Sequence, residues 1–384
     1  MSLPTAGLWR PALAGCLATF LGVGLQRFAY SPLLPAMIQD GWVSPGAGGV
    51  LGAANLGAYL FGALYGPAAG RRFGLRRTLR GAMLLAAACF ALCAIRGSLV
   101  WLLPWRFLAG VAGGALMVLA GPAVQQAVPV GRRGLAGGLL FAGVGLGVVA
   151  GAAIVPGLLP WGVSAAWLGL CAAGLLSAAA AWRLWPDVPP PPPRGGRLFG
   201  RAVPGAGLLM IAYALAAVAA APHMLWWADF IARGLGRGTN AGAASWLIWG
   251  VAGALGPAVC GRLADRIGAW RALLAAFLVQ EAALAIPLLS AAPWLLSLSA
   301  AAAGGTAIGV TALTLTRIRE LAGEGTPRLW ALGTAAYGAA QTLAGFGMAG
   351  LYAATDSHLP LFGLGLLGGA LALPLLPPRG GQAP

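Results

Sequence analysis

Apolar residues dominate this chain in long runs, and short polar or arginine-rich stretches separate one run from the next. A helix that crosses a lipid bilayer needs about 20 consecutive, mostly apolar residues. Runs of that length recur along the whole sequence. The pattern therefore predicts twelve membrane-spanning helices, at residues 11–36, 47–69, 79–95, 98–126, 134–158, 162–182, 204–230, 241–261, 271–290, 293–316, 329–353 and 358–377.

The composition excludes a soluble protein. Hydrophobic residues make up 59% of the 384 residues and charged residues 8%, whereas soluble proteins carry about 25% charged residues. So few charges cannot cover a soluble core of this size. The five cysteines lie in apolar runs without metal-ligand spacing, so we expect packing roles for them and neither a metal nor a cofactor.

All 24 basic residues are arginines, and the formal net charge is +16. The arginines form short clusters between apolar runs, not the continuous stripe typical of nucleic-acid binding. If the N-terminus is cytoplasmic, the outer loops contain only Arg96, Arg233 and Arg237. Because positively charged loops stay on the cytoplasmic side, we predict that both termini are cytoplasmic and that the protein lies in the bacterial cytoplasmic (inner) membrane.

A linker at residues 183–203, with the stiff run Pro189–Pro193, divides the chain into two expected six-helix halves, residues 1–182 and 204–384. The halves resemble each other. Arg71–Gly74 follows the second predicted span, and Asp265–Gly268 follows the eighth, 194 residues later. Such spacing is typical of two parallel repeats.

The second of these turns belongs to the stretch Gly261–Gly268, which reads GRLADRIG and resembles the G-x-L-A-D-R-x-G signature of the major facilitator superfamily. Gly268 permits a tight turn, Asp265 can accept hydrogen bonds from a helix N-terminus, and Arg266 can donate to helix carbonyls. We predict a conformational latch from Gly261, Asp265, Arg266 and Gly268, together with Gly74 of the first half. The alternative is an ordinary charged loop. The first half keeps Gly74 but has Arg71 in place of the aspartate.

The first predicted span contains GLQRFAYSPLLP at residues 24–35, which resembles the G-x-G-R-F-x-Y-x-P-L-L-P signature of the YbfB/YjiJ-type family in this superfamily. Gln26 replaces a glycine of the signature. Residues 52–60, Tyr337 and Gln341 extend the resemblance over nearly the whole chain. The resemblance implies an all-α fold of two pseudo-symmetric six-helix bundles and transport by a rocker-switch form of alternating access.

Two arginines fall inside predicted spans. An arginine at the bilayer centre costs about 2.5–3.5 kcal/mol on insertion scales, so Arg27 is expected to bind an anionic group or to form an internal ion pair, with Tyr30 on its helix face. Arg106 either faces the interior or snorkels to the interface. The glycines that follow it in the fourth span allow close approach of a partner helix.

In the second half, the repeat makes His223 the counterpart of Arg27, with Trp226 and Trp227 expected on its face. A histidine can carry a proton near neutral pH, or stay neutral and bond to a helix carbonyl. Glu281, in mid-span, requires a protonated form or a buried partner. These two residues and Asp229 are the candidates for proton coupling, although a solvated position at a helix end is the simpler interpretation of Asp229.

Asn55 with Tyr59, and Tyr337 with Gln341, are pairs spaced four residues apart. They would line a substrate cavity or form bonds between helices. The other residues expected at this cavity are Arg27, Tyr30, Arg106, His223, Trp226 and Trp227. We predict a monomeric secondary transporter of a small molecule, with an organic anion as substrate and protons as coupling ion. The direction of transport, uptake or efflux, is left open. A non-transporting sensor or scaffold is the main alternative. An embedded transferase is disfavoured because acids and histidines are few and scattered.

Overall fold

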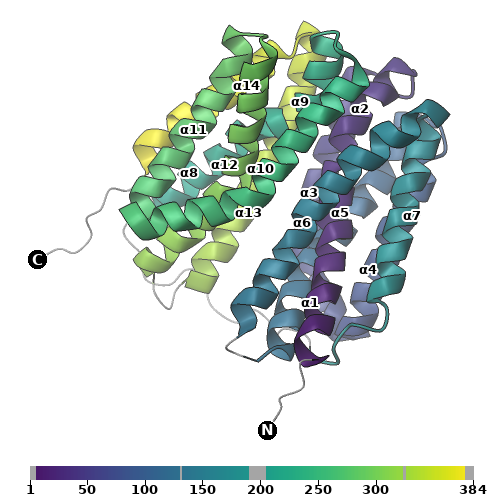
Figure 1. The fold of residues 1–384 in the computed structure, drawn as a ribbon, viewed down its shortest axis with the longest axis vertical. Coiled ribbons are helices and arrows are strands. Elements are labelled where there is room, and N and C mark those ends of the chain that lie inside the picture. Colours follow the sequence, from purple (N-terminus) through teal and green to yellow (C-terminus); the bar gives the residue numbers. More distant parts are fainter. Residues whose placement is uncertain (1–5, 130–131, 190–204, 323–325, 377–384) are drawn as a thin grey trace, which may run out of the picture. The chain divides into compact units, whose positions relative to one another are not determined.

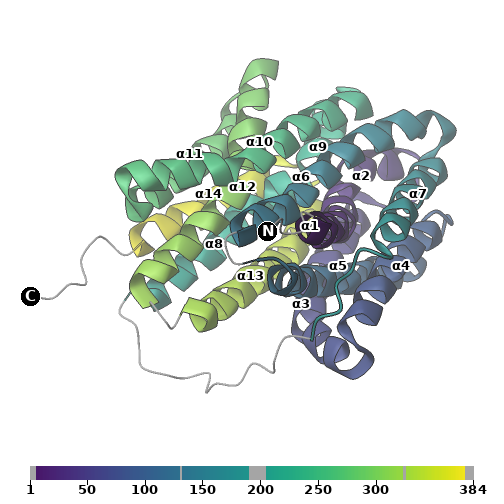
Figure 2. The same ribbon diagram turned by 60° about the horizontal axis from the view of Figure 1, so that its bottom comes forward.

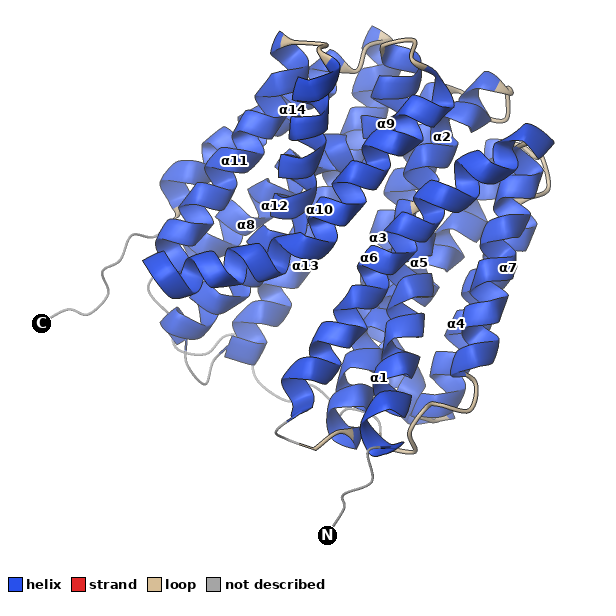
Figure 3. Ribbon diagram, in the orientation of Figure 1, coloured by secondary structure: helices blue, strands red, loops and turns tan. Residues whose placement is uncertain are grey.

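The computed structural model describes residues 6–129, 132–189, 205–322 and 326–376. Within these ranges, every regular element is a helix (Figure 3). The chain divides into two compact units, residues 1–195 and 196–384, which we call unit 1 and unit 2. Residues 190–203, which hold most of the expected linker, lie outside the described residues.

Unit 1 consists of α1 (Ala6–Thr19), η1 (Phe20–Phe28), α2 (Tyr30–Gln39), α3 (Pro45–Phe73), α4 (Leu75–Cys93), α5 (Leu99–Ala127), α6 (Arg133–Leu158), η3 (Leu159–Trp161) and α7 (Val163–Ala181). Unit 2 consists of α8 (Ala206–Leu225), α9 (Trp227–Asp229), η4 (Phe230–Gly234), α10 (Gly238–Ile267), α11 (Ala269–Leu289), α12 (Pro293–Ala322), α13 (Thr326–Thr355), α14 (Leu359–Ala372) and η6 (Leu373–Leu375).

Local sequence explains several helix boundaries. Ser44 and Ser98 precede α3 and α5, and their hydroxyls accept hydrogen bonds from the third following backbone N–H, at 3.3 and 3.4 Å. Gly74 joins α3 to α4 with φ +85°, and Gly268 joins α10 to α11 with φ +87°. Residues with a Cβ rarely adopt such a positive φ, so both positions require glycine. The two turns predicted from the repeat are therefore confirmed.

The helices pair in a corresponding way inside each unit. In unit 1, α3 packs on α5, and α1 packs on α5, α6 and α7 (Figure 1 and Figure 2). In unit 2, α10 packs on α12, and α8 packs on α12, α13 and α14. The pairing of α4 with α7 in unit 1 likewise corresponds to that of α11 with α14. This correspondence agrees with the internal repeat expected from the sequence.

Nine helices in the described ranges are long and apolar enough to cross a membrane. The first of them runs from Trp9 to Gln39 through α1, η1 and α2. Helix α4 is not among the nine and carries three arginines in its first two turns, and α14 is only 14 residues long. Every predicted span overlaps a described helix, and the chain is a multi-pass membrane protein. The number twelve and the orientation stay predictions.

Candidate functional site

A π-helical segment, η1, lies in the middle of the first long helix and carries Gln26 and Arg27. π-Helical turns are rare and occur frequently at functional sites. Gln26 and Arg27 lie at its end, and Gln26 is buried, with its side-chain Nε2 donating to the carbonyl of Ala86 on α4. The glutamine that departs from the family signature therefore joins η1 to α4.

Arg106 on α5 is buried, with 2% of its surface exposed. Its Nη1 donates to the carbonyl of Gln26 at 3.2 Å, and its Cζ lies 4.3 Å from the ring centroid of Tyr30 and 5.8 Å from that of Trp167. Arg106 therefore faces the interior of unit 1, and the snorkelling alternative is wrong. The cation is stabilised by a carbonyl and by the electron-rich faces of aromatic rings.

The acidic residues of unit 1 are Asp40 and Asp187. Both are exposed, and Asp187 forms an ion pair of 3.8 Å with Arg76 near the surface. The buried positive charge of unit 1 is therefore not matched by a buried carboxylate of the same unit. A cation buried without a carboxylate is costly, and the site is electrostatically suited to a negative group.

Two polar residues expected near a cavity are engaged in bonds between helices. The hydroxyl of Tyr30 donates to the carbonyl of Gly48 at 2.8 Å, and Nδ2 of Asn55 donates to the carbonyl of Arg106 at 2.9 Å. For Asn55 the structure supports the alternative of an interhelical bond. The contact of Tyr30 with Arg106 was not predicted, because the helix pattern placed Tyr30 on the face of Arg27.

Arg27 and Tyr59 are only half-buried. The guanidinium carbon of Arg27 lies 5.7 Å from the ring centroid of Tyr59 and 5.5 Å from that of Phe28. This arrangement combines a positive charge with flanking aromatic surface on η1 and α3.

Three glycines of α5 set the position of these groups. A Cβ on Gly110 would lie 2.2 Å from the carbonyl oxygen of Asn55, and one on Gly114 would lie 2.0 Å from that of Tyr59. A Cβ on Gly113 would lie 2.1 Å from the carbonyl oxygen of Gly22 in η1. The close helix approach predicted from the glycines after Arg106 is confirmed.

In unit 2, His223 on α8 is buried. Its Nε2 lies 2.9 Å from the hydroxyl of Ser299, and that hydroxyl donates to the carbonyl of Ala283 at 2.7 Å. Because the single hydroxyl proton of Ser299 is used in the second bond, Nε2 of His223 must be the donor in the first. The histidine thus reaches a helix carbonyl through a serine.

The two tryptophans expected beside His223 contact different residues. Trp227 stacks on His223 with 4.6 Å between centroids, as predicted. Trp226 instead stacks on Tyr352 of α13, at 4.9 Å, so its expected place beside His223 is wrong. Helix α8 ends at Leu225 and α9 begins at Trp227. The interruption changes the helical phase between these neighbours.

Asp229 is fully buried, so its interpretation as a solvated helix-end carboxylate is wrong. Its two oxygens accept hydrogen bonds of 2.6 and 2.5 Å from Nε and Nη2 of Arg233, and Oδ2 lies 2.7 Å from Nε2 of His358. Arg233 also donates to the hydroxyl of Tyr352 at 3.3 Å. The structure thus assembles a charged cluster from η4, α9, α13 and the residue before α14.

Sequence reasoning missed this cluster because Arg233 was assigned to a loop and His358 lies 129 residues from Asp229. It also found no histidine–aspartate pair, whereas His358 and Asp229 form one. The spacing of four residues between Asp229 and Arg233 was an available signal, since such pairs face each other on a helix.

Glu281 of α11 has both carboxyl oxygens buried, and neither forms a hydrogen bond within the described residues. A Cβ on Gly369 of α14 would lie 1.6 Å from Oε1. The carboxyl group is therefore packed against the backbone of α14. One of the two alternatives for Glu281 was a buried partner for its carboxyl group. Among the described residues, no such hydrogen-bonding partner is present.

The remaining predicted residues lie elsewhere in unit 2. Tyr337 packs on Tyr213 at 4.6 Å between centroids, and Gln341 is buried with Nε2 3.0 Å from the sulfur of Met224. Asp265 and Arg266 are exposed near the end of α10, and in the described ranges neither side chain forms a hydrogen bond or ion pair. Nothing lies within 4 Å of the position that a Cβ on Gly261 would occupy. The latch remains a prediction.

The fold is that of a membrane transporter. Two solved structures of the POT family of transporters are similar to this chain. They are an auto-inhibited peptide transporter, with TM-score 0.69, 14% identity and 95% of each chain covered, and PepTSo, with TM-score 0.71, 12% identity and 98% of each chain covered. Identities this low show the fold alone.

A family model described as uncharacterised MFS-type transporter YbfB matches residues 19–376, and the chain belongs to this family. The resemblance inferred from the motifs is thereby confirmed. The family and the fold are those of a transport protein rather than an enzyme.

Curated relatives are also transporters or resistance proteins. The 4-hydroxybenzoate transporter PcaK of Acinetobacter baylyi is 31% identical, over 40% of this chain and 33% of its own length. A putative metabolite transport protein of Haemophilus influenzae is 29% identical, over 46% and 42%. The chloramphenicol resistance protein of Streptomyces lividans is 28% identical, over 69% and 68%. The chain thus spans less than half the length of each of the first two relatives.

Proposed function

We propose that this protein is a secondary transporter that moves a small organic anion across the bacterial cytoplasmic membrane by alternating access. The observation that carries the choice of an anion is the position of Arg27, a half-buried cation inside the first apolar span of a unit whose two acidic residues are both exposed. Arg27, with the rings of Phe28 and Tyr59 beside it, is the group that we assign to the substrate. Aromatic rings around a guanidinium suit a substrate with an aromatic or planar apolar part.

The relatives suggest the first probes. One of them is named for 4-hydroxybenzoate, an aromatic carboxylate, and another for resistance to chloramphenicol, which carries no carboxylate. Purified protein in liposomes should transport an aromatic carboxylate in preference to the neutral compound, because only the former offers a negative charge to Arg27.

The proposal is tested with Arg27→Gln and Arg27→Lys. We expect loss of transport in Arg27→Gln and partial retention in Arg27→Lys, which keeps the charge but loses the planar fork of donors. An Arg319→Gln variant removes a charge from an exposed position of α12, outside the predicted latch, and serves as the control. Absence of gradient-dependent transport across a broad metabolite panel would overturn the proposal.

We assign proton coupling to Glu281, with His223 and Asp229 as the other candidates. Support comes from its buried and unpartnered oxygens, because a carboxyl group in that environment favours the neutral, protonated form. Asp229 is bonded by Arg233 and His358, and the Nε2 proton of His223 is engaged by Ser299, so both are less available. Glu281→Gln should still bind substrate but lose the dependence of transport on a pH gradient. Asp40→Asn, which changes an exposed carboxylate of unit 1, is the control.

Twelve spans with both termini cytoplasmic complete the proposal, and the arginine distribution supports them. Reporter fusions at the two ends test this orientation, and reporters on opposite sides of the membrane would contradict it. The alternative of a sensor or scaffold predicts that Arg27→Ala and His223→Ala fully complement a deletion strain. A transporter predicts that Arg27→Ala does not.

A further inference from the structure

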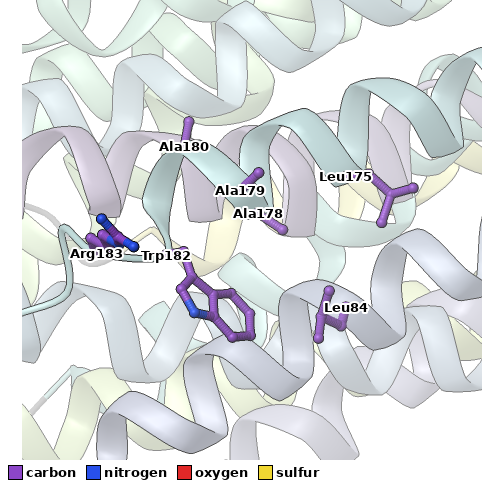
Figure 4. A pocket seen from close by; sticks show the side chains of 7 residues that line it. All are labelled: Leu84, Leu175, Ala178, Ala179, Ala180, Trp182 and Arg183. Carbon is purple, nitrogen blue, oxygen red and sulfur yellow. The ribbon is translucent and has the colours of Figure 1, made fainter.

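An open groove of about 620 Å³ lies between α4 and α7 on the surface of unit 1 (Figure 4). Binding sites for small molecules commonly have volumes of about 300–1,000 Å³. Its walls are mostly apolar, and the small side chains of three consecutive alanines of α7 leave the groove open there. The lining residues are Leu84, Leu175, Ala178, Ala179, Ala180, Trp182 and Arg183.

One end of the groove is built from polar and aromatic groups. Nε of Arg80 donates to the carbonyl of Trp182 at 2.9 Å, and the guanidinium carbon lies 4.7 Å from the centre of the indole. These contacts hold the indole in the groove, between the two helices and on the side of Leu84 (Figure 4). Arg183 follows at the same end and is exposed.

The length of α7 places this end at the level of the lipid headgroups. Its 19 residues rise by about 28 Å at 1.5 Å per residue, close to the thickness of about 30 Å of the hydrocarbon core. Trp182 and Arg183 come directly after its last residue, Ala181. Tryptophan is enriched at the membrane interface, where its ring is partly immersed and its N–H is wet.

The charge at this end is positive. The first turns of α4 carry Arg76, Arg77 and Arg80. Among the described residues, the acidic side chain near them is Asp187, which follows α7 and forms an ion pair with Arg76. The whole chain has 8 acidic and 24 basic residues. A second copy of the chain therefore has little negative charge to offer, whereas an anionic lipid brings both a phosphate and an acyl chain.

We propose that this groove binds one anionic phospholipid. The acyl chain lies along Leu84, Leu175 and the alanines, and the phosphate contacts Arg183. The site needs only a protein embedded in a membrane, so it does not depend on what the protein transports.

Native mass spectrometry of the purified full chain tests the proposal. The protein in detergent is given phosphatidylglycerol or phosphatidylcholine with identical acyl chains. We expect about fivefold higher retention of phosphatidylglycerol, as for one arginine near an anionic surface. Equal retention of the two lipids overturns the proposal.

Variants locate the site. Arg183→Gln should lower retention of phosphatidylglycerol to that of phosphatidylcholine, and Ala179→Leu, which fills the groove, should lower retention of both lipids. The controls are Arg262→Gln, on an exposed part of unit 2, and Ala153→Leu, on an exposed part of α6. All four positions are exposed, and thermal unfolding checks that each variant is folded.

Several results would contradict this assignment. If Arg262→Gln lowers retention as much as Arg183→Gln, net charge and not the groove attracts the lipid. If Ala179→Leu and Ala153→Leu behave alike, the acyl chain lies elsewhere. Displacement of the lipid by excess inorganic phosphate would show that the site takes a free anion instead.

Discussion

In unit 1 the guanidinium of Arg106 is buried against a backbone carbonyl and two aromatic rings. In unit 2 the carboxylate of Asp229 is buried against Arg233 and His358. The helix pairings of the two units correspond, so the difference lies in the side chains. Removing Asp229 leaves the charge of Arg233 uncompensated, whereas removing Arg106 leaves only a carbonyl and rings.

The largest effect is therefore expected from Asp229→Ala. Breaking a buried ion pair by removing one partner costs about 3–5 kcal/mol, and thermal unfolding in detergent measures the loss. Asp356→Asn is a suitable control because Asp356 is exposed and has φ +48°, a conformation that asparagine tolerates. Arg233→Ala added to Asp229→Ala should recover part of the stability. A double variant less stable than either single variant would contradict the coupling.

A smaller loss is expected from Arg106→Gln in unit 1. The variant loses a hydrogen bond from a charged donor, which contributes about 1.5–3 kcal/mol, and the contact with the ring of Tyr30. It also removes a costly buried charge, which offsets part of that loss. If Arg106→Gln destabilises the protein as much as Asp229→Ala under the same conditions, the contrast between the units fails.

The helix contacts themselves should respond alike in both units. Gly110→Ala forces α5 away from α3, and Gly256→Ala forces α10 away from α12, where a Cβ would lie 2.1 Å from the carbonyl oxygen of Gly305. Overpacking of this kind costs about 1–3 kcal/mol. Gly121→Ala is the matched control, because nothing lies within 4 Å of its Cβ position on α5. Equal stability of Gly110→Ala and Gly121→Ala would show that α5 and α3 can separate freely.

The smallest effect is expected from Tyr30→Phe. The variant removes the hydrogen bond to the carbonyl of Gly48 but keeps the ring against Arg106. Hydrogen bonds between membrane helices contribute about 0.6 kcal/mol on average. Tyr65→Phe, at an exposed position of α3, is the control. A loss several times larger would mean that the hydroxyl, and not only the ring, positions Arg106.

Part of the site was predictable from local patterns. The glycines after Arg106, the stacking of Trp227 on His223 and the interior position expected for an intramembrane arginine follow from helical spacing and from the cost of exposing charge to lipid. The place of Trp226 was not predictable in the same way, because a break at the end of α8 changes the phase. Glu281 was recognised as costly, but its contact with Gly369 joins helices far apart in sequence.

The amino-acid pattern alone is enough to place the helices, the turns at Gly74 and Gly268 and the membrane environment. These depend on run length, hydropathy and local backbone freedom, which are properties of short segments. Which polar groups contact each other follows instead from the packing of helices that are distant in the chain. Arg106 bonds to a carbonyl 80 residues away, and Asp229 to a histidine 129 residues away. Such pairs form because a buried polar group must find a partner among whatever the packed helices bring near it, and no local pattern records that choice.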